Sequence, residues 1–449
     1  METTRGMEKR AIWGWMLFDW ASQPFYTLIL TFVFAPYIAT AINGGGAAGQ
    51  AAWADINLVA ALSVALAAPI LGALTDALGR RKMWFAGLAV IYVLGVLGLW
   101  NAASDSPILP MALAYCAAFI AAELMIVVTN AMLPDLGDDK QMGRISGFGW
   151  ALGYVGGIVS LFIMLAFFMP ADGKETTLIG LSPVFGLGEI EGGAARASGP
   201  FAALWFLIFI IPFFLWTRDV APVRGTIASG LSDLARSIRS LPKKPNLLNY
   251  LLASMFYRDA LAGIYTFGAI YAAGVLGWTS FDLGIFGIIS ALIGAIGGVL
   301  GGLADERFGP RPVIRVAILL LILTSITVIT TRPDQVLFMS VADGSNLPNL
   351  VFYGCGGMIG AAGAALSAAS RTMLVHQAKD EIPITEAFGL YAMTGKATAF
   401  LAPLLIGFAT RVTDSQPLGV APVILLFLLG YGLLMRVGPA KITQNAARR

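Results

Sequence analysis

Long apolar stretches separated by short polar segments recur along the whole chain. Each stretch is close to the roughly 20 residues that an α-helix needs to cross the hydrocarbon core of a bilayer. The pattern predicts about twelve transmembrane helices. Their expected ranges are 13–41, 53–75, 82–101, 108–132, 143–169, 200–217, 247–275, 281–303, 311–331, 347–374, 386–411 and 418–437.

Composition agrees with this pattern. Hydrophobic residues make up 57% of the chain, charged residues only 12%, and the mean hydropathy is +0.78. Soluble domains carry about 25% charged residues. We therefore expect an all-α, multi-pass membrane protein whose first partner is the lipid bilayer. The first span is too long, and too interrupted by Asp19, Gln23 and Pro24, for a cleaved signal peptide.

One loop sequence occurs twice. A glycine-rich helix end runs into an acidic and basic turn at residues 72–82 and again at 301–311. Such a repeat predicts two pseudo-symmetric six-helix bundles, residues 1–217 and 247–449, with a translocation pathway between them. Residues 218–246 combine basic residues with leucines at helical spacing, which predicts a cytoplasmic linker containing an amphipathic helix.

The basic residues are distributed unevenly. Of the 29 Lys and Arg, four are predicted on the side opposite both termini, at Lys174, Arg196, Arg332 and Arg411. Two more, Arg258 and Lys396, fall inside spans, and the rest lie on the side of the termini. This bias predicts that both termini are cytoplasmic, and we expect the protein in an inner or plasma membrane. The net charge of +3 gives no reason to expect a nucleic-acid partner.

Ionisable residues within the spans are the strongest indication of a site. A charge at a helix centre costs about 2.5–3.5 kcal/mol, so these side chains should face a cavity or a partner. Acidic and basic side chains fall in opposite halves, an arrangement that suits a zwitterionic substrate. Alternatively, the same charges pair with one another across the halves. The residues concerned are Asp19, Glu123, Arg258, Asp259 and Lys396.

Polar neighbours extend this candidate site. Gln23, Tyr26, Asn130 and Tyr391 are expected to help line a substrate cavity. Asp19 or Glu123 could also carry a coupling proton, because a low-dielectric cavity disfavours a charged carboxyl group. Arg258 and Asp259 project about 100° apart on a helix, so we expect them to take different partners.

The repeated loops supply candidate gating residues. Asp76 can pair with guanidinium groups or with a helix N-terminus and so close one face, whereas Arg80 and Arg81 could serve only to orient the protein. The full gating set is Gly72, Asp76, Gly79, Arg80, Arg81, Asp305, Arg311, Arg371 and Glu386. Glycines 149, 153 and 157 form small-xxx-small steps, which we expect to pack between the halves.

The loop at Gly72, Asp76, Gly79, Arg80 and Arg81 resembles the signature of the major facilitator superfamily, and the resemblance covers essentially the whole chain. Further matches are similar to the vacuolar amino-acid effluxers of autophagy and their bacterial relatives. They occur at residues 18–26, 246–248 with Asp259, 370–371, 386–391 and 395–396. One departure is Ser367, where that branch has a glutamine. The resemblance implies a secondary transporter of amino acids that works by alternating access.

Other classes fit less well. Cys116 and Cys355 fall in apolar spans and His376 is the single histidine, so neither a disulfide framework nor a metal site is expected. Without a Cys-His pairing or a Gly-x-Ser-x-Gly elbow, we expect no enzyme and no cofactor. The alternatives are an exporter of a lipid-like or drug-like amphiphile, a sugar transporter, and a non-transporting receptor or scaffold. A monomer is expected.

Overall fold

The computed structural model describes a defined part of the chain. The described residues are 2–41, 44–78, 80–103, 106–132, 135–136, 139–171, 174–219, 235–236, 239–342, 344–378, 381, 387, 390–391, 393–395 and 398–438. Within them, the side chains of 2–8, 69–70, 72–74, 76–78, 131, 139–144, 146–147, 150–151 and 306 are not described. The predictions for the Gly72 and Asp76 side chains, for Gly79, Glu386 and Lys396, and for most of the linker therefore lie outside the described residues.

The first half of the chain is helical. Its main helices are α1 (Glu2–Pro24), α2 (Phe34–Ala41), α3 (Gly46–Leu78), α4 (Arg81–Gly98), α5 (Ile108–Met132), α6 (Asp139–Ile163), α7 (Gly193–Phe209) and α8 (Ile211–Trp216). Two π-helices, η1 (Phe25–Phe32) and η5 (Met164–Phe168), extend α1 and α6, and η3 (Leu99–Asn101) and η6 (Val184–Glu189) are short 3-10 turns. Pro24 ends α1 at the start of η1, because proline cannot donate to the helical ladder.

The second half repeats the helical plan. Its elements are η7 (Leu241–Lys243), α10 (Pro245–Val275), α11 (Ser280–Phe308), α12 (Pro310–Ile329), α13 (Leu347–Ala378), α15 (Leu401–Thr413), α16 (Gln416–Val420) and α17 (Pro422–Met435). Strands β1 (Gln335–Val336) and β2 (Met339–Ser340) form a small antiparallel hairpin, in which Gln335 pairs with Ser340.

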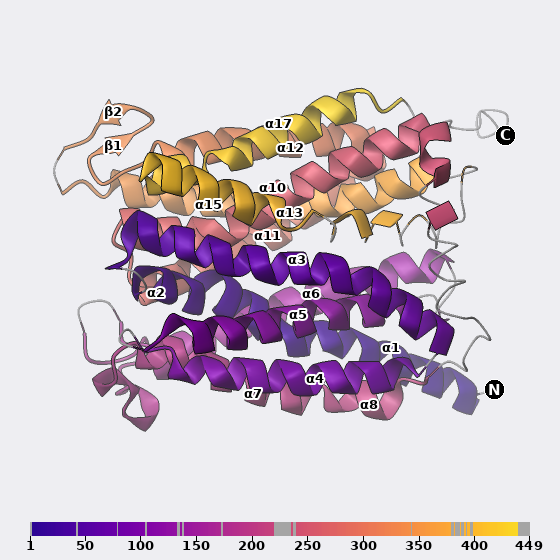
Figure 1. Ribbon diagram of the computed structural model, residues 1–449, viewed down its shortest axis with the longest axis horizontal. Helices are drawn as coiled ribbons and strands as arrows, with labels where there is room; N and C mark the ends of the chain where they lie inside the picture. Colours follow the sequence, from indigo (N-terminus) through magenta and orange to yellow (C-terminus); the bar gives the residue numbers. More distant parts are fainter. Residues whose placement is uncertain are drawn as a thin grey trace.

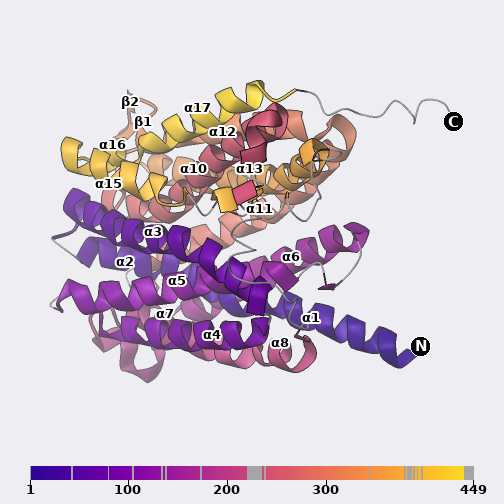
Figure 2. The same cartoon turned by 45° about the vertical axis from the view of Figure 1, so that its right-hand side comes forward.

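The expected all-α membrane fold is confirmed. Nine described segments are long and apolar enough to cross a membrane, two shorter apolar helices cover Leu152–Phe168 and Leu401–Thr413, and α10 adds 31 residues. The helices run along the long axis of the molecule (Figure 1). α1 through α8 form one side and α10 through α17 the other, a separation that persists after a 45° turn (Figure 2). The boundaries at residues 217 and 246 stay predictions, since 220–234 lie outside the described residues.

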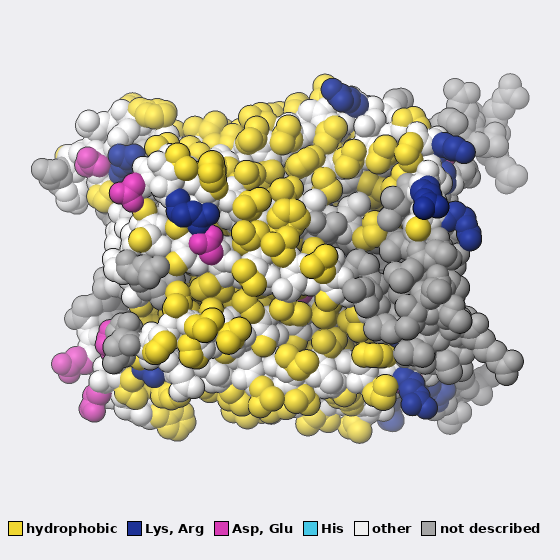
Figure 3. All heavy atoms as spheres, viewed as in Figure 1, with side chains coloured by type: hydrophobic (Ala, Val, Ile, Leu, Met, Phe, Trp, Pro, Cys, Tyr) yellow, Lys and Arg dark blue, Asp and Glu magenta, His cyan; other side chains and the backbone are white. Residues whose placement is uncertain are grey.

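Two ends of the molecule can be distinguished. α1 begins and α17 ends at the same end, which we name the terminal face (Figure 1). The β1–β2 hairpin lies at the opposite end, the distal face. Hydrophobic side chains cover the middle of the surface, and the described Lys, Arg, Asp and Glu side chains gather toward the two ends (Figure 3). Large apolar side chains such as Leu66 (73% exposed) and Val299 (65%) face outward there. A lipid-facing belt explains this exposure.

The two halves meet near the distal face. α3 packs against α15, α2 against α10, and α6 against α11. On α11, a Cβ added to Gly284 would lie 2.7 Å from Leu165, and one added to Gly287 would lie 2.8 Å from Leu161. Glycine therefore permits the close approach of α11 to the end of α6.

The glycines of α6 have a different role from the predicted one. Cβ atoms added to Gly149, Gly153 and Gly157 would meet side chains of α1 and η1, at 2.6, 3.2 and 2.7 Å. α1, η1 and α6 belong to the same half. The prediction that these glycines pack between the halves was wrong, because small-xxx-small spacing shows that a helix is approached closely but not by which neighbour.

Candidate functional site

A polar stripe on the first membrane helix begins the candidate site. Asp19, Gln23 and Thr27 follow one another at helical spacing, and Gln23 Nε2 donates to Thr27 Oγ1 at 3.2 Å. All three face the glycines of α6, since the added Cβ of Gly149 would lie 2.6 Å from Asp19 Oδ2. The absence of side chains on α6 thus makes room for a polar stripe at membrane depth.

Arg371 of α13 lies within electrostatic range of this stripe from the other half. The charges of Asp19 and Arg371 interact electrostatically, and Arg371 also interacts with Tyr154 of α6. Both Asp19 and Arg371 are half-buried. In the sequence Arg371 was predicted to act in gating, whereas Arg258 and Lys396 were expected to supply the positive charge for a substrate. Opposite charges from opposite halves therefore lie close enough to interact, and the described cation is Arg371, whereas Lys396 lies outside the described residues.

Glu123 is joined to Tyr26. The Tyr26 hydroxyl donates to Glu123 Oε1 at 3.2 Å and so links η1 with α5. Tyr26 also packs edge-on against Phe25, with ring centroids 5.4 Å apart. Two residues expected in the cavity are thus brought together. Asn130, expected beside them, lies exposed near the terminal end of α5.

Arg258 forms a second cationic centre within the second half. Its guanidinium carbon lies 4.1 Å from the centre of the Tyr391 ring, and its Nη1 donates to the Tyr391 carbonyl oxygen at 2.9 Å. A Cβ on Gly395 would come within 2.7 Å of this guanidinium, so glycine makes the space that it occupies. The Tyr250 ring lies parallel to the Tyr391 ring, with 6.3 Å between the ring centroids.

Asp259 faces away from Arg258. It is 4% exposed, and its Oδ2 accepts a hydrogen bond from the backbone N–H of Ala402 at 3.1 Å. The expectation that the two neighbours take different partners is confirmed. Ala402 lies in the first turn of α15, followed by Pro403. A proline cannot continue the helical ladder from the preceding turn, which explains why α15 starts at Leu401 after a turn at 398–400.

Apart from Arg371, the described gating candidates contact their own halves. Arg81 pairs with Asp135 at 2.7 Å, and the neighbouring Lys82 donates to the last carbonyls of α8. Arg80 adopts a left-handed conformation, φ 53°, at the turn before α4. In the second copy, Arg311 donates to the carbonyl oxygen of Met435 at 3.1 Å, and Asp305 bonds with Thr372 of α13. A gating role for these residues stays a prediction.

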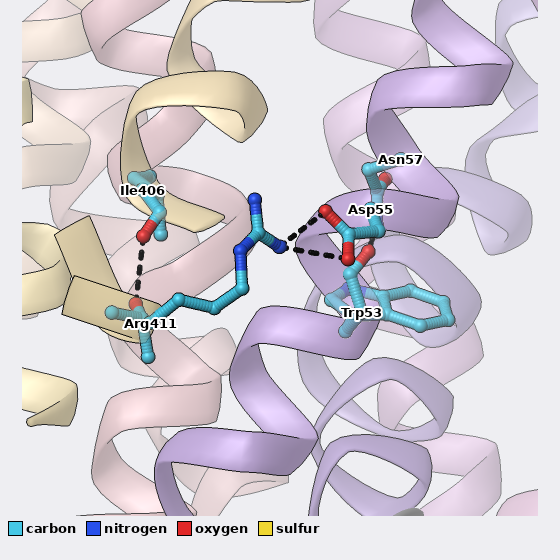
Figure 4. A network of polar contacts seen from close by, with 6 residues as sticks. Trp53, Asp55, Asn57, Ile406 and Arg411 are labelled. Atoms are coloured by element: carbon cyan, nitrogen blue, oxygen red, sulfur yellow. Dashed lines mark hydrogen bonds and ion pairs between the residues drawn. The ribbon is translucent and has the colours of Figure 1, made fainter. Parts of the chain in front are cut away.

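At the distal face, sequence analysis missed a polar link between the halves. Arg411 of α15 binds both carboxylate oxygens of Asp55 of α3 (Figure 4). Beside it, Gln50 donates to Thr410 Oγ1 at 2.9 Å and to the Gln416 carbonyl at 3.3 Å. Arg411 was recognised only as a distal basic residue. The available signal was the opposite charge of Asp55 and Arg411 near the distal ends of the predicted spans 53–75 and 386–411.

An apolar cavity lies between η1 and the second half. Its volume is about 40 Å³, between Phe32 of η1 and Tyr265, Phe286 and Phe352 of the other half. Ser290 on its wall has a buried hydroxyl with no hydrogen-bond partner among the described residues. The cavity could receive an apolar group that carries one polar atom.

The chain is similar in sequence to a known protein family and to a bacterial relative. A model of the family described as "vacuole effluxer Atg22 like" matches residues 137–447. The uncharacterised MFS-type transporter YxiO of Bacillus subtilis (strain 168) is 25% identical over 430 residues, 94% of this chain and 93% of that protein.

Solved structures share the fold. A D-xylose-proton symporter superposes with a TM-score of 0.65 at 12% identity, covering 96% of this chain and 97% of the symporter. A bacterial homologue of the human lysosomal transporter Spinster gives 0.63 at 16% identity, covering 96% and 97%. The expected two-bundle fold is confirmed by these likenesses. The chain therefore belongs to the vacuole effluxer Atg22-like family, and it is a membrane transporter of the major facilitator type.

Proposed function

We propose that this transporter moves a small zwitterion, such as an amino acid, across a bacterial cell membrane by alternating access. The observation that carries the proposal is the electrostatic interaction of Asp19 with Arg371, two opposite charges from opposite halves. A substrate ammonium group would bind Asp19 and its carboxylate would bind Arg371. Both charges then gain a partner on desolvation, and the substrate connects the two halves.

The surrounding residues suit a small molecule. Tyr154 interacts with Arg371 on one side, and Tyr391 lies close enough to Arg371 to interact electrostatically on the other. Arg258 is held against Tyr391, so its charge adds to the attraction for a carboxylate without blocking Arg371. Glu123, bonded to Tyr26, adds a second acidic group in the first half.

The distribution of charge supports an orientation. Basic residues prefer cytoplasmic loops, and the sequence concentrates them on the side of the termini. The terminal face is then cytoplasmic, and the cross-half contacts of Asp55 and Gln50 close the external face. The protein acts as a monomer in this proposal, since each chain carries both halves of its own pathway.

One observation favours a second candidate. The apolar cavity beside Phe32 and Phe286 would suit an apolar part of a lipid-like or drug-like amphiphile better than the charged groups of a free amino acid. In that case the charges at Asp19 and Arg371 would only stabilise each other.

Ligand-dependent unfolding of the purified protein separates these candidates, because a ligand that binds the folded state raises its apparent stability. We would test amino acids, small peptides, sugars and amphiphiles, and then measure counterflow of any hit in proteoliposomes. Asp19→Asn and Arg371→Gln should each lower uptake about tenfold to a hundredfold, the effect of losing a charged hydrogen bond worth about 1.5–3 kcal/mol.

Matched controls remove the same residue types elsewhere. Asp334 and Arg332 lie exposed beside the β1–β2 hairpin. The variants Asp334→Asn and Arg332→Gln should therefore transport at the wild-type rate. The double variant Asp19→Asn/Arg371→Gln should regain stability but not uptake. Full uptake by the double variant, or stabilisation by amphiphiles alone, would overturn the zwitterion proposal.

A further inference from the structure

The carboxyl group of Asp259 is only half satisfied. Its Oδ2 accepts from Ala402 N–H, whereas Oδ1 is buried and has no hydrogen-bond partner among the described residues. A buried carboxylate oxygen without a partner is costly, because the charge loses its hydration and gains nothing. The site therefore requires something that neutralises Oδ1.

The surroundings of Asp259 are apolar. One turn along α10, a Cβ added to Gly263 would meet Ala402, Val423 and Ile406, all within 3.6 Å. α15 and α17 thus enclose this part of α10 with hydrocarbon. A metal cation needs several oxygen ligands, which these side chains do not supply. A single proton needs only the one free oxygen.

No charged or titratable side chain on the described helices around α10 interacts with Asp259. Arg258, its neighbour in sequence, is bound to Tyr391. The other ionisable groups with described partners lie elsewhere: Tyr250 and Tyr257 contact Ser370, Tyr265 contacts Ile359, Tyr271 contacts Thr331, Arg371 interacts with Asp19, and Arg411 pairs with Asp55.

Asp259 also connects α10 to the start of α15. The first turn of α15 is bonded to Asp259 through Ala402, and α15 ends at the distal face, where it carries Thr410 and Arg411. The rise from Ala402 to Arg411 is about 14 Å along one helix. The turn at 398–400 separates α15 from the preceding segment, so α15 can move as a unit.

We propose that Asp259 is the proton-binding residue of this transporter and that its protonation holds α15 in the distal-closed position. With Oδ1 protonated, Asp259 is neutral and fits the apolar packing while Oδ2 keeps its bond to Ala402. Loss of the proton leaves a buried charge that only water can solvate. α15 then moves away to admit water, and the contacts of Arg411 and Thr410 with the other half break.

This proposal deepens the proposed function and rests on it for the alternation of the two halves. It does not depend on the identity of the substrate, so its test uses none. Spin labels on Thr40→Cys of α2 and Val412→Cys of α15 would report the distance across the distal face. Cys116 and Cys355 would first be replaced by alanine.

In the wild-type background we expect a short distance at acidic pH and a longer, broader distribution at alkaline pH. Asp259→Asn keeps an acceptor for Ala402 N–H but cannot ionise, so the short distance should persist at every pH. The matched control is Asp414→Asn at the other end of α15, an exposed position with φ 47° that asparagine tolerates. It should keep the wild-type response.

Infrared titration of the same proteins supplies a second readout that does not require the asparagine variant to fold. A protonated-carboxyl band should disappear as pH rises, and Asp259→Glu should shift it. A wild-type pH response in Asp259→Asn, or an infrared band unmoved in Asp259→Glu, would overturn the proposal. A distance change driven by Na⁺ at constant pH, and absent in Asp259→Asn, would replace the proton with a metal cation.

Discussion

Asp55 of α3 and Arg411 of α15 form an ion pair that joins the two halves at the distal face, with Arg411 Nη1 2.6 Å from Oδ1 and 2.8 Å from Oδ2 (Figure 4). The residues on either side of Asp55 anchor this part of α3. Trp53 beside it is fully buried, and Asn57 donates to the Trp53 carbonyl at 2.8 Å. Tyr115 of α5 then donates to Asn57 at 2.7 Å and fixes α3 to its own bundle.

Neutralising Asp55 should shift the transporter toward distal opening. The Arg411 and Asp55 side chains remain 46% and 54% exposed, so their pair should be worth about 0.2–1 kcal/mol. Asp55→Asn should therefore raise the distal-open population up to about fivefold. Labelling of a cysteine placed at Thr410 with a membrane-impermeant thiol reagent, added outside intact cells, measures that population. The charge swap Asp55→Arg/Arg411→Asp should restore the wild-type rate, and equal labelling in all variants would contradict a latch.

The contact between α1 and α6 should be intolerant of side chains on α6. Added Cβ atoms at Gly149 and Gly157 would come within 2.6 and 2.7 Å of Asp19 and Thr27. Gly157→Val should therefore destabilise the protein by about 1–3 kcal/mol through overpacking. Thermal unfolding in detergent measures this. Gly354→Val on α13, where nothing lies within 4 Å of the added atom, is the matched control and should change stability little.

Arg258 should not be replaceable by lysine. Its guanidinium carbon lies over the Tyr391 ring while Nη1 donates to the Tyr391 carbonyl, a combination that a point-like ammonium cannot reproduce. Arg258→Lys should lose about 0.5–2 kcal/mol of stability, the range of a cation–π contact. Unfolding of wild type, Arg258→Lys, Tyr391→Leu and Arg258→Lys/Tyr391→Leu gives the coupling between the two residues. An unchanged loss in the Tyr391→Leu background would show that the ring contributes nothing.

The sequence predicted the membrane fold well because hydropathy is a property of each segment by itself. It also identified Asp19 and Asp259 as significant, since a charge inside an apolar span is conspicuous wherever its partner lies. Partners were harder to predict. Arg371 lies near the end of its predicted span and was interpreted as a gating residue, although it comes close to Asp19 in the fold.

Contacts between the halves depend on tertiary geometry that no single span contains. The spacing of Gly149, Gly153 and Gly157 does not show whether the glycines pack against α1 or against a helix of the other half. The break within the predicted span 386–411 is different, because it can be explained from the sequence. Pro403 has no backbone N–H to donate, so the helix is interrupted at the preceding turn. The pairing of Asp55 with Arg411 required knowledge that α3 and α15 are neighbours.

Filling the apolar cavity should separate the two substrate classes. Gly268 lines this cavity, and an added Cβ there meets nothing within 4 Å. Gly268→Leu should fold normally, and removing a helical glycine should itself add about 0.5–1 kcal/mol of stability. If a zwitterion binds between Asp19 and Arg371, its stabilising effect should be the same in Gly268→Leu and wild type. An amphiphile that occupies the cavity should instead lose its effect in this variant. Thermal shifts with both ligand classes decide between them, and Gly432→Leu on α17, where the added Cβ also meets nothing within 4 Å, controls for the added leucine.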